Sequence, residues 1–477
     1  MSNTAQESAR SRISALLDDN SFVEIGGLVT ARTTNFNLQA KDTPADGVVT
    51  GYGVIDGNLV YVYSQDANVL NGSVGEMHAK KICRLYDLAL KMGAPVIGLL
   101  DCAGLRLQEA SDALNGFGEI YMKQSMASGV IPQITAVFGS CGGGLSVLTG
   151  LSDFTFMEEK NGRLFVNTPN TLDNNYTAKC DTASAKFQSE ETENVDFAGD
   201  EAAVIEAMRQ LVSMLPSNNE DDASFEDCED DLNRVCEGIE NGAGDPEYVL
   251  SALSDNGVFF EVKKDYAKKI VTGFIRLNGA TVGAVANRTE LLDAEGNVSE
   301  KYDAKLCPNC ALKAADFINF CDAFNIPVLT LANVDGYVAT LGAEKKIAKA
   351  ASKLTYAYAN ATVPKVTVVT GNALGTASVT MGSKALGCDL YYAWPNAQIG
   401  MMDAEFAAKI LASGKEASAV SEAQTEYAKL QSSESAAARG FVDAVLEPAD
   451  TRKYVIEAFE MLFTKREDRP GKKHGTV

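Results

Sequence analysis

The sequence repeats itself at a distance of 232 positions, and this repeat restricts the possible folds more than any other feature. Ile131 to Gly150 aligns without gaps on Val363 to Gly382, and eight of the twenty positions are identical. At the same offset, Ala79 to Gly104 aligns on Ala311 to Gly336. Long segments that match in the same order indicate an internal duplication. We therefore predict two copies of one fold, placed one after the other along the chain.

Each copy alternates strand patterns with helix patterns. In the first copy, residues 47–63 predict a hairpin that turns at Asp56-Gly57. Helical spacing follows over residues 76–92, then a buried strand over 95–100 and a second helix over about 111–128. Strands and helices in alternation predict a layered α/β fold.

A strongly acidic run lies between the two copies. In residues 217–231, eight of fifteen side chains are Asp or Glu, which is typical of a solvated linker. We predict an N-terminal domain over residues 1–216, an acidic linker over 217–246 and a C-terminal domain over 247–477. The second copy also carries a polar insertion of ten residues between Leu291 and Cys310.

Composition argues against several classes of function. The net charge of −22 disfavours non-specific nucleic-acid binding, which depends on neutralising phosphates. No apolar run approaches the roughly 20 residues that cross a bilayer, and the N-terminus lacks the pattern of a secretory signal. We expect a cytoplasmic protein whose ten cysteines are reduced thiols. Only His78 and His474 are available for histidine-based acid–base chemistry.

The most informative motif of each copy is a glycine-rich turn between a buried strand and a helix. The first is Phe138 to Leu145, and the second is Gly371 to Ala377. Glycine lets the backbone approach a ligand, and N–H groups at such a turn can stabilise a negatively charged oxygen without a catalytic side chain. Close packing of helix against strand is the structural alternative. Because the turn recurs, we favour two anion-stabilising sites, one for each of two substrates.

Two cysteine patterns compete with this interpretation. The first turn fits the pattern glycine-x-nucleophile-x-glycine, with Cys141 in the nucleophile position. A thiolate nucleophile needs an activating base, and the second copy has Ala373 at that position, so we favour a small buried thiol. Cys307-Pro-Asn-Cys310 has the spacing of a zinc site, but no second pair lies nearby, so we predict no metal site.

Three cationic residues are candidates for contacts with an anionic ligand. Lys80 and Lys81 lie in the helix predicted over residues 76–92 and could neutralise phosphates, although ordinary surface charges are the alternative. Arg106 follows the end of a strand, where ligands bind in α/β sheets. For His78 a hydrogen-bonded structural role is the better interpretation.

Several runs together resemble the carboxyltransferase subunits of biotin-dependent acyl-CoA carboxylases and decarboxylases, of the propionyl-CoA carboxylase beta and methylmalonyl-CoA decarboxylase alpha type. The resemblance extends from Ile13 to the end of the chain. It is carried by Gly72–Ile82, Ala127–Ile134, Phe320–Pro327, Thr355–Val366, Met381–Asp389 and Lys472–Gly475. It implies two tandem crotonase-like (ClpP/crotonase) ββα-spiral domains. It also implies a homo-oligomer, a dimer-based hexamer, in which acyl-CoA binds the N-terminal domain and biotin binds the C-terminal domain of a neighbouring subunit.

The same resemblance implies the reaction and its partners. A carboxyl group would pass between carboxybiotin on a carrier protein and the α-carbon of a short acyl-CoA, such as acetyl- or propionyl-CoA, through an enolate held by backbone oxyanion holes. Biotin would sit on a separate carrier domain or subunit, and coenzyme A would enter as part of the substrate. The partners would be a biotin carboxyl carrier and a biotin carboxylase. The alternative is the membrane subunits of a sodium-pumping decarboxylase, with this chain as the decarboxylating subunit.

Matched to the family motifs, individual residues receive roles. Gly143 and Gly144 would hold the thioester enolate, and Thr376 and Ala377 would hold the biotin ureido oxygen. Val379 would line the acyl pocket. Gly142 and Gly375 are further candidate binding residues of the two turns, in addition to Lys80, Lys81 and Arg106, which the residue patterns suggested.

The sequence departs from the family pattern at several positions, including the following two. Thr376 stands where the family usually has glycine, and the loop after Gly336 is shorter than usual. A different class of enzyme, a biotin-independent crotonase-like acyl-CoA hydrolase or isomerase, would need only the first turn.

Overall fold

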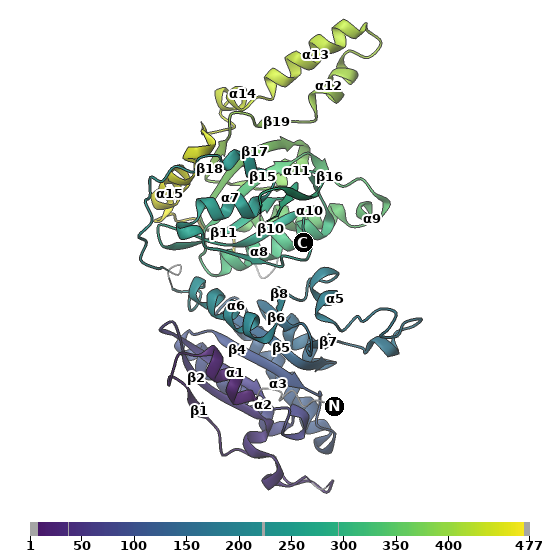
Figure 1. Cartoon of the computed structure of the whole chain (residues 1–477), viewed down its shortest axis with the longest axis vertical. Coiled ribbons are helices and arrows are strands. Elements are labelled where there is room, and N and C mark those ends of the chain that lie inside the picture. The colour runs from purple at the N-terminus through teal and green to yellow at the C-terminus, as the bar shows by residue number, and fades with distance from the viewer. Residues whose placement is uncertain (1–7, 37, 222–224, 294, 472–477) are drawn as a thin grey trace. The chain divides into compact units, whose positions relative to one another are not determined.

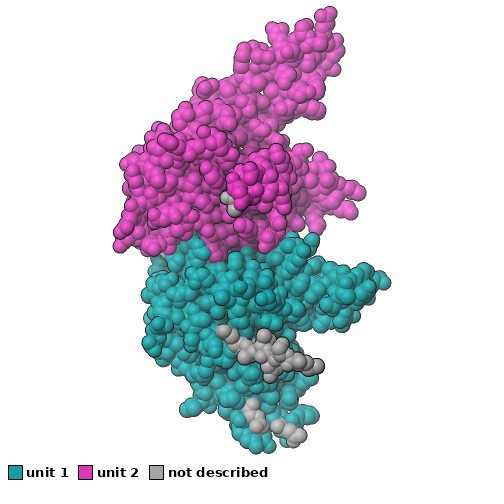
Figure 2. Space-filling view, viewed as in Figure 1, with its two compact units in different colours: residues 1–224 teal, residues 225–477 magenta. Residues whose placement is uncertain are grey.

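The computed structural model describes residues 8–36, 38–221, 225–293 and 295–471. His474 and the tail motif at 472–475 therefore lie outside the described residues. The chain divides into two compact units, unit 1 over residues 1–224 and unit 2 over residues 225–477 (Figure 2). Within the range predicted as a linker, Cys236 and Ile239 are buried in unit 2.

Unit 1 is built on one mixed sheet (Figure 1). Its strand order is β1-β2-β3-β4-β5-β6-β8, with β7 paired to β5. The β1–β2 pairing and the β2–β3 hairpin are antiparallel, and every later pairing is parallel. The strands are β1 (Val23–Ile25), β2 (Val48–Ile55), β3 (Asn58–Gln65), β4 (Val96–Cys102), β5 (Gln133–Gly142), β6 (Phe154–Glu158), β7 (Arg163–Phe165) and β8 (Phe197–Gly199). The helices are α1 (Ala9–Leu16), α2 (Glu76–Met92), α3 (Ser111–Ala127), α4 (Gly144–Gly150), α5 (Ala185–Glu190) and α6 (Glu201–Met214).

Unit 2 repeats this topology. Its sheet has the order β9-β10-β11-β15-β17-β18-β20, with β19 paired to β17, so each strand of unit 1 has a counterpart at the same place. This correspondence confirms the predicted duplication. The strands of the sheet are β9 (Phe259–Val262), β10 (Ile270–Leu277), β11 (Ala280–Asn287), β15 (Val328–Val334), β17 (Lys365–Leu374), β18 (Leu390–Ala393), β19 (Gln398–Gly400) and β20 (Ala444–Val445). The helices are α7 (Pro246–Leu253), α8 (Pro308–Ala323), α9 (Leu341–Glu344), α10 (Ile347–Asn360), α11 (Gly375–Thr380), α12 (Ala404–Leu411), α13 (Ala417–Leu430), α14 (Ser433–Ala438) and α15 (Thr451–Leu462).

The insertion in the second copy forms short strands of its own. β12 (Glu290–Leu292) and β13 (Val298–Lys301) pair as a small antiparallel ribbon. β14 (Lys305–Leu306) then pairs in parallel with β16 (Gly336–Tyr337), which follows β15. The insertion therefore ends beside the carboxyl end of a central strand.

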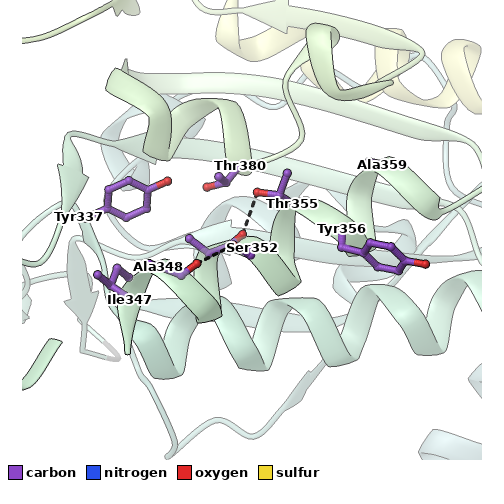
Figure 3. Close-up of a pocket in the computed structure, with 9 residues that line it drawn as sticks. Tyr337, Ile347, Ala348, Ser352, Thr355, Tyr356, Ala359 and Thr380 are labelled. Carbon is purple, nitrogen blue, oxygen red and sulfur yellow. Dashed lines mark hydrogen bonds between the residues drawn. The ribbon is translucent and has the colours of Figure 1, made fainter. Parts of the chain in front are cut away.

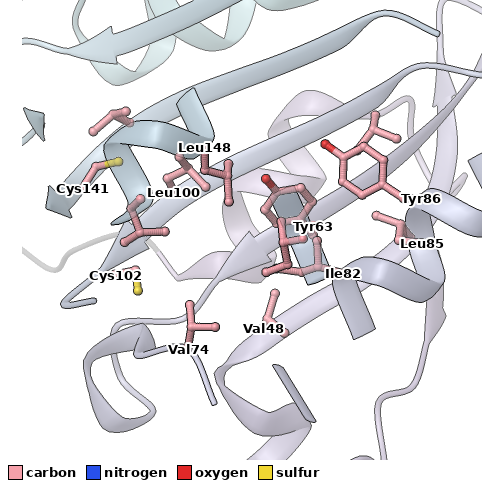
Figure 4. Close-up of a cluster of buried hydrophobic side chains, with 14 of the residues drawn as sticks. Val48, Tyr63, Val74, Ile82, Leu85, Tyr86, Leu100, Cys102, Cys141 and Leu148 are labelled. Carbon is pink, nitrogen blue, oxygen red and sulfur yellow. The ribbon is translucent and has the colours of Figure 1, made fainter. Parts of the chain in front are cut away.

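Helix α2 shows how the sequence builds the core of unit 1. Its buried residues recur with helical spacing, so one face of the helix is apolar. Ile82 and Leu85 on that face pack in one cluster with Tyr63 and Leu100 of the sheet (Figure 4). Fully burying a side chain of this size stabilises the fold by about 1.5–3 kcal/mol. The helix ends at Gly93, whose φ of 60° favours glycine.

One predicted boundary is wrong in an informative way. The sequence predicted a strand ending at Val137 and a turn beginning at Phe138, whereas β5 continues to Gly142. The extension exists because Ser140 to Gly142 pair in parallel with β7. In unit 2, β17 is extended to Leu374 by β19 in the same way. The glycine turn is therefore shorter than predicted.

Candidate active site

The first turn is centred on Gly143, between β5 and α4. Gly143 has a φ of 61° and a ψ of −121°, which strongly favours glycine. Its N–H donates to the carbonyl of Phe165 on β7 at 2.9 Å. Gly144, the first residue of α4, is exposed. The backbone therefore reverses at Gly143 and brings the start of α4 to the surface.

The second turn repeats this geometry. Gly375 has a φ of 65° and begins α11, with Thr376 exposed beside it. The Ser378 hydroxyl donates to the Gly375 carbonyl at 2.8 Å, just as the Ser146 hydroxyl donates to the Gly143 carbonyl at 2.7 Å. In both turns a serine thus holds the glycine carbonyl.

The N–H groups at the start of the two helices are the chemically important part of the turns. The first N–H groups of a helix have no acceptor within the helix. Among the described residues, the backbone hydrogen bonds in turns, loops and helix caps include none donated by the N–H groups of Gly144, Leu145, Thr376 or Ala377. Each turn therefore presents two adjacent donors, an arrangement that can stabilise negative charge on a ligand oxygen.

The repeat and the family motif assign these donors differently. At the offset of 232, Gly144 corresponds to Thr376 and Leu145 to Ala377. The pairs predicted from the motif, Gly143 with Gly144 and Thr376 with Ala377, are therefore not equivalent positions. Because the Gly143 N–H is already bonded to Phe165, the geometry favours Leu145 as the second donor. The offset alone would have revealed Leu145.

Other glycines of the motif serve packing. A Cβ on Gly139 would lie 2.0 Å from Asp101 Oδ1, and a Cβ on Gly371 would lie 2.5 Å from Asn333 Oδ1. A Cβ on Gly142 would lie 2.6 Å from the Phe165 ring. The structural alternative therefore applies to these positions, because each glycine lies in a strand against a neighbouring side chain.

Cys141 has no environment in which it could act as a nucleophile. Its side chain is fully buried, in one cluster with Leu100, Cys102 and Leu148 (Figure 4). Burial raises the pKa of the Cys141 thiol well above its usual value. A thiol that stays protonated in an apolar core is a poor nucleophile.

His78 is structural, as predicted. Its imidazole is fully buried, with Nδ1 3.0 Å from the carbonyl oxygen of Asp46 and Nε2 3.3 Å from Nε2 of Gln65. Burial, with the nearby Arg106 charge, lowers the pKa of His78 to about 3. The ring is therefore neutral near pH 7 and donates from Nδ1 to the Asp46 carbonyl, so it supplies no exchangeable proton to a substrate.

The three predicted cations lie in different environments. Lys80 is half exposed and pairs with Glu76 at 2.6 Å. The Lys81 ammonium is buried and donates to the carbonyls of Ala45, at 2.8 Å, and Val48. Burial lowers the pKa of Lys81 to about 8. Lys81 therefore holds the loop before β2, and only Lys80 can meet a solvated phosphate.

Arg106 is also committed to the fold. Its guanidinium is fully buried and forms ion pairs with Asp46 and with Glu109, the latter at 2.9 Å. It donates further to the Ser73 carbonyl at 2.7 Å. The position after a strand end had suggested a ligand contact, but the side chain turns inward to neutralise two carboxylates.

Unit 2 contains a cavity of about 630 Å³ beside α11. Residues of α10 form one wall, and Tyr337 of β16 and Thr380 of α11 line it as well (Figure 3). Val379, predicted to line the acyl pocket, is exposed next to Thr380 but is not among the lining residues. Small and apolar side chains give the cavity room for an aliphatic or ring group. The lining residues are Tyr337, Ile347, Ala348, Ala351, Ser352, Thr355, Tyr356, Ala359 and Thr380.

One cysteine pair contradicts the prediction of reduced thiols. Cys307 and Cys310 are joined by a disulfide. The start of α8 brings their Cα atoms to 5.0 Å, which is within disulfide range. Across the described ranges, no group of three or more His, Cys, Asp or Glu side chains could hold a metal ion. In the same residues, no helix has the length and apolar character to cross a membrane.

The family of the chain follows from its sequence as a whole. A family model described as a carboxyl transferase domain matches residues 3–477. The chain belongs to the carboxyltransferase family. It is similar to the methylmalonyl-CoA decarboxylase subunit alpha of Propionigenium modestum, with 40% identity over 98% of this chain and 92% of that protein. It is equally similar to the propionyl-CoA carboxylase beta chain of Roseobacter denitrificans, with 40% identity over 98% and 93% of the two chains.

Solved structures agree with this assignment. The transcarboxylase 12S subunit, solved as a hexamer with methylmalonyl-coenzyme A bound, superposes with a TM-score of 0.91. The two proteins are 38% identical over 99% of this carboxyltransferase and 92% of that chain. The carboxyltransferase described here is therefore an enzyme with two tandem crotonase-like domains, as the resemblance implied.

Proposed function

We propose that this carboxyltransferase moves a carboxyl group between biotin on a carrier protein and the α-carbon of a short acyl-CoA, with propionyl-CoA and methylmalonyl-CoA as the substrate pair. The observation that carries the proposal is the pair of equivalent turns. Each turn presents two adjacent N–H groups at the start of a helix, for which the backbone hydrogen bonds of the described turns, loops and caps show no acceptor. The relatives named for propionyl-CoA carboxylase and methylmalonyl-CoA decarboxylase support the choice of substrate.

In unit 1, the donors would act on the thioester. When the α-proton of an acyl-CoA leaves, negative charge develops on the thioester oxygen. The N–H groups of Gly144 and Leu145 would donate to that oxygen, and they need no reorganisation because Gly143 fixes the turn. Removing one such donor typically lowers turnover by about 10² to 10³. Lys80, half exposed on α2, is the candidate contact for a coenzyme A phosphate.

In unit 2, the second turn fits the ureido group of biotin. The N–H groups of Thr376 and Ala377 would donate to its oxygen, and the neighbouring cavity offers apolar surface to its rings. The positive φ of the turn lies on Gly375, so a threonine at 376 keeps its N–H available without backbone strain. When bound, biotin supplies the carrier on which the carboxyl group travels.

The proposed partners follow from the reaction. A biotin carboxyl carrier must reach unit 2, and a biotin carboxylase or a membrane-bound decarboxylase must complete the cycle. A hexamer is the proposed assembly, because the transcarboxylase 12S structure is described as one.

A second function, within the same chemistry, is the decarboxylating subunit of an acyl-CoA decarboxylase. The specific observation in its favour is the 40% identity to the methylmalonyl-CoA decarboxylase alpha subunits of two organisms. The two turns serve both directions, because the same oxygen atoms become negative whichever way the carboxyl group moves.

The test uses purified protein with methylmalonyl-CoA and free biotin, followed by chromatography of the CoA esters. We expect propionyl-CoA to form only when biotin is present. Turnover without biotin would support the hydrolase or isomerase class instead. With a carboxylated carrier and propionyl-CoA or acetyl-CoA, the relative rates would rank the acyl groups and show whether the carboxylation direction is used.

A further inference from the structure

The cysteine pair at the start of α8 has no role in the proposed carboxyl transfer. Cys307 is the N-cap of the helix, Pro308 is its first residue, and Cys310 lies in its first turn. The Cys310 N–H donates to Cys307 Sγ at 3.0 Å. Two sulfur ligands are too few for a structural zinc site, which needs four protein ligands. The pair therefore requires an explanation other than metal binding.

The two cysteines differ in exposure. Cys307 is half-buried, whereas Cys310 is 1% exposed. In disulfide exchange, an external thiolate must reach one sulfur while the other leaves. The difference in burial between the two residues therefore favours Cys307 as the cysteine that is attacked and Cys310 as the one whose sulfur leaves. A Cys-x-x-C pattern beside a strand–helix–strand unit is the arrangement of dithiol redox motifs.

Helix α2 of unit 1, the equivalent of α8, shows which groups accept hydrogen bonds from the first turn of the helix. At the offset of 232, the pair corresponds to Gly75 and His78. There the Glu109 carboxylate accepts from the Glu76 N–H at 2.6 Å, and the Asp46 carboxylate accepts from the His78 N–H at 2.7 Å. Carboxylates thus bring negative charge to the first turn of α2. In α8 the sulfur of Cys307 takes the place of the acceptor for the corresponding N–H, and a thiolate there would be stabilised likewise.

The pair is coupled to the cavity of unit 2 through one strand pair. Cys307 directly follows β14, whose Leu306 pairs with Tyr337 of β16. The Val338 N–H donates to the Leu306 carbonyl at 3.1 Å. Tyr337 lines the cavity, as does Ile347 of α10 (Figure 3). A rearrangement at the start of α8 therefore reaches the cavity wall through adjacent residues.

We propose that Cys307 and Cys310 form a reversible thiol–disulfide switch, reduced by an external dithiol, and that reduction loosens the β14–β16 pair that carries Tyr337. The disulfide ties the end of β14 to the first turn of α8. When it is broken, that tether is lost and the Val338 hydrogen bond opens more often.

The exchange balances with a dithiol as the reductant. One thiolate of the dithiol attacks Cys307 Sγ and forms a mixed disulfide, and Cys310 leaves as a thiolate. The second thiol of the reductant then attacks its own sulfur in the mixed disulfide, so Cys307 leaves as a thiolate. The two protons of the dithiol end on Cys307 and Cys310, and two electrons pass from the reductant, which becomes a cyclic disulfide.

The first measurement is the redox titration of the full-length protein in dithiothreitol buffers, with alkylation by N-ethylmaleimide and mass spectrometry of the peptide containing both cysteines. We expect the peptide to pass reversibly between no added groups and two, with Cys307 modified first. Glutathione, a monothiol, should reduce the pair less completely and leave some mixed disulfide on Cys307. A peptide that never changes state, or that changes irreversibly, overturns the switch.

The second measurement is amide hydrogen exchange in the segment around Val338, which does not depend on turnover. We expect exchange there to become severalfold faster on reduction. The variant Cys307→Ser should exchange at the fast rate in both buffers, and Cys180→Ser, which changes an exposed lone thiol, should behave like wild type. Equal exchange in oxidised and reduced wild type overturns the coupling to the cavity. Wild type alone decides this result if Cys307→Ser fails to fold.

Discussion

Units 1 and 2 have the same backbone turn at the start of α4 and α11 but different side chains around it. Both place a positive-φ glycine before two open N–H donors, at Gly143 and at Gly375. The residue after that glycine is Gly144 in one unit and Thr376 in the other. The difference teaches that the useful feature is the backbone turn, because it survives changes of side chain on either side of it.

A second comparison concerns two buried lysines at the same offset. Lys81 donates to the backbone carbonyls of Ala45, in the loop before β2, and of Val48, the first residue of β2. Lys313 donates to three carbonyls, those of Lys263, Tyr266 and Ile270, at 2.7 to 3.0 Å. In each unit the lysine lies on the helix after the antiparallel hairpin and connects that helix to the segment before the hairpin. This interaction was therefore also kept after the duplication.

The largest effect should come from Gly143→Val. No atom lies within 4 Å of the new Cβ, so the cost is backbone strain of about 1–3 kcal/mol rather than a clash. The turn should shift, and biotin-dependent turnover should fall by at least about 10²-fold while the unfolding transition remains cooperative. Gly150→Ala, also open and without a positive φ, is the matched control and should retain turnover. Normal activity of Gly143→Val would remove the turn from the mechanism.

The next effect is on stability, in Lys313→Met and Lys81→Met. Each change removes an ammonium that donates to buried carbonyls, so the free energy of unfolding should fall by about 1–3 kcal/mol. Lys313→Met should cost more because it removes three hydrogen bonds rather than two. Urea unfolding measures both, and Lys80→Met, on the exposed side of α2, should change little. An equal, negligible loss in all three would mean that the buried ammonium groups are dispensable.

A smaller effect should appear in the pH dependence of unit 1. Burial raises the pKa of Asp153 to about 7 from a usual value near 4. Because the folded carboxyl binds its proton more tightly than the unfolded one, this group lowers the free energy of unfolding as pH rises from about 4 to 7. Asp153→Asn keeps an oxygen for the Gln133 N–H and should remove this slope in urea titrations.

Unit 2 provides the contrast for that measurement. Its counterpart Asp389, which accepts from the Lys365 N–H at 2.8 Å, also contacts the Lys465 ammonium at 2.8 Å. Asp389→Asn should therefore lower the free energy of unfolding, because it removes an ion pair. It should not remove the pH dependence that is expected from Asp153. If Asp153→Asn keeps the wild-type slope, the carboxyl of Asp153 is not the titrating group.

The smallest effect is expected for Cys141→Ala. The change makes a small cavity in a packed core and should lower the free energy of unfolding by about 1–2 kcal/mol. Turnover should be close to wild type, as in the second copy, where Ala373 occupies this position. A variant that folds but has lost activity would restore Cys141 as a nucleophile.

Regular elements and the duplication could be predicted because their signals are local or repeated. Helix α2 begins and ends where the apolar spacing predicted, and the first hairpin turns at Asp56-Gly57. The extension of β5 to Gly142 could not be predicted, because it depends on β7, which lies about twenty residues further along the chain. The burial of Lys81 and Arg106 was missed since lysine and arginine are usually exposed, and only the fold supplies their partners.

The buried lysines have a consequence for an enzyme that handles thioesters. Acyl-CoA thioesters acylate free lysine amines, and an acylated lysine loses its charge and keeps one N–H donor of three. A chain modified at Lys81 or Lys313 before folding could not satisfy the carbonyls that the ammonium groups hold, whereas the folded chain hides both amines. Only chains whose Lys81 and Lys313 amines are unmodified would therefore fold. Mass spectrometry should find acyl groups on these two lysines in aggregated protein and not in the folded fraction.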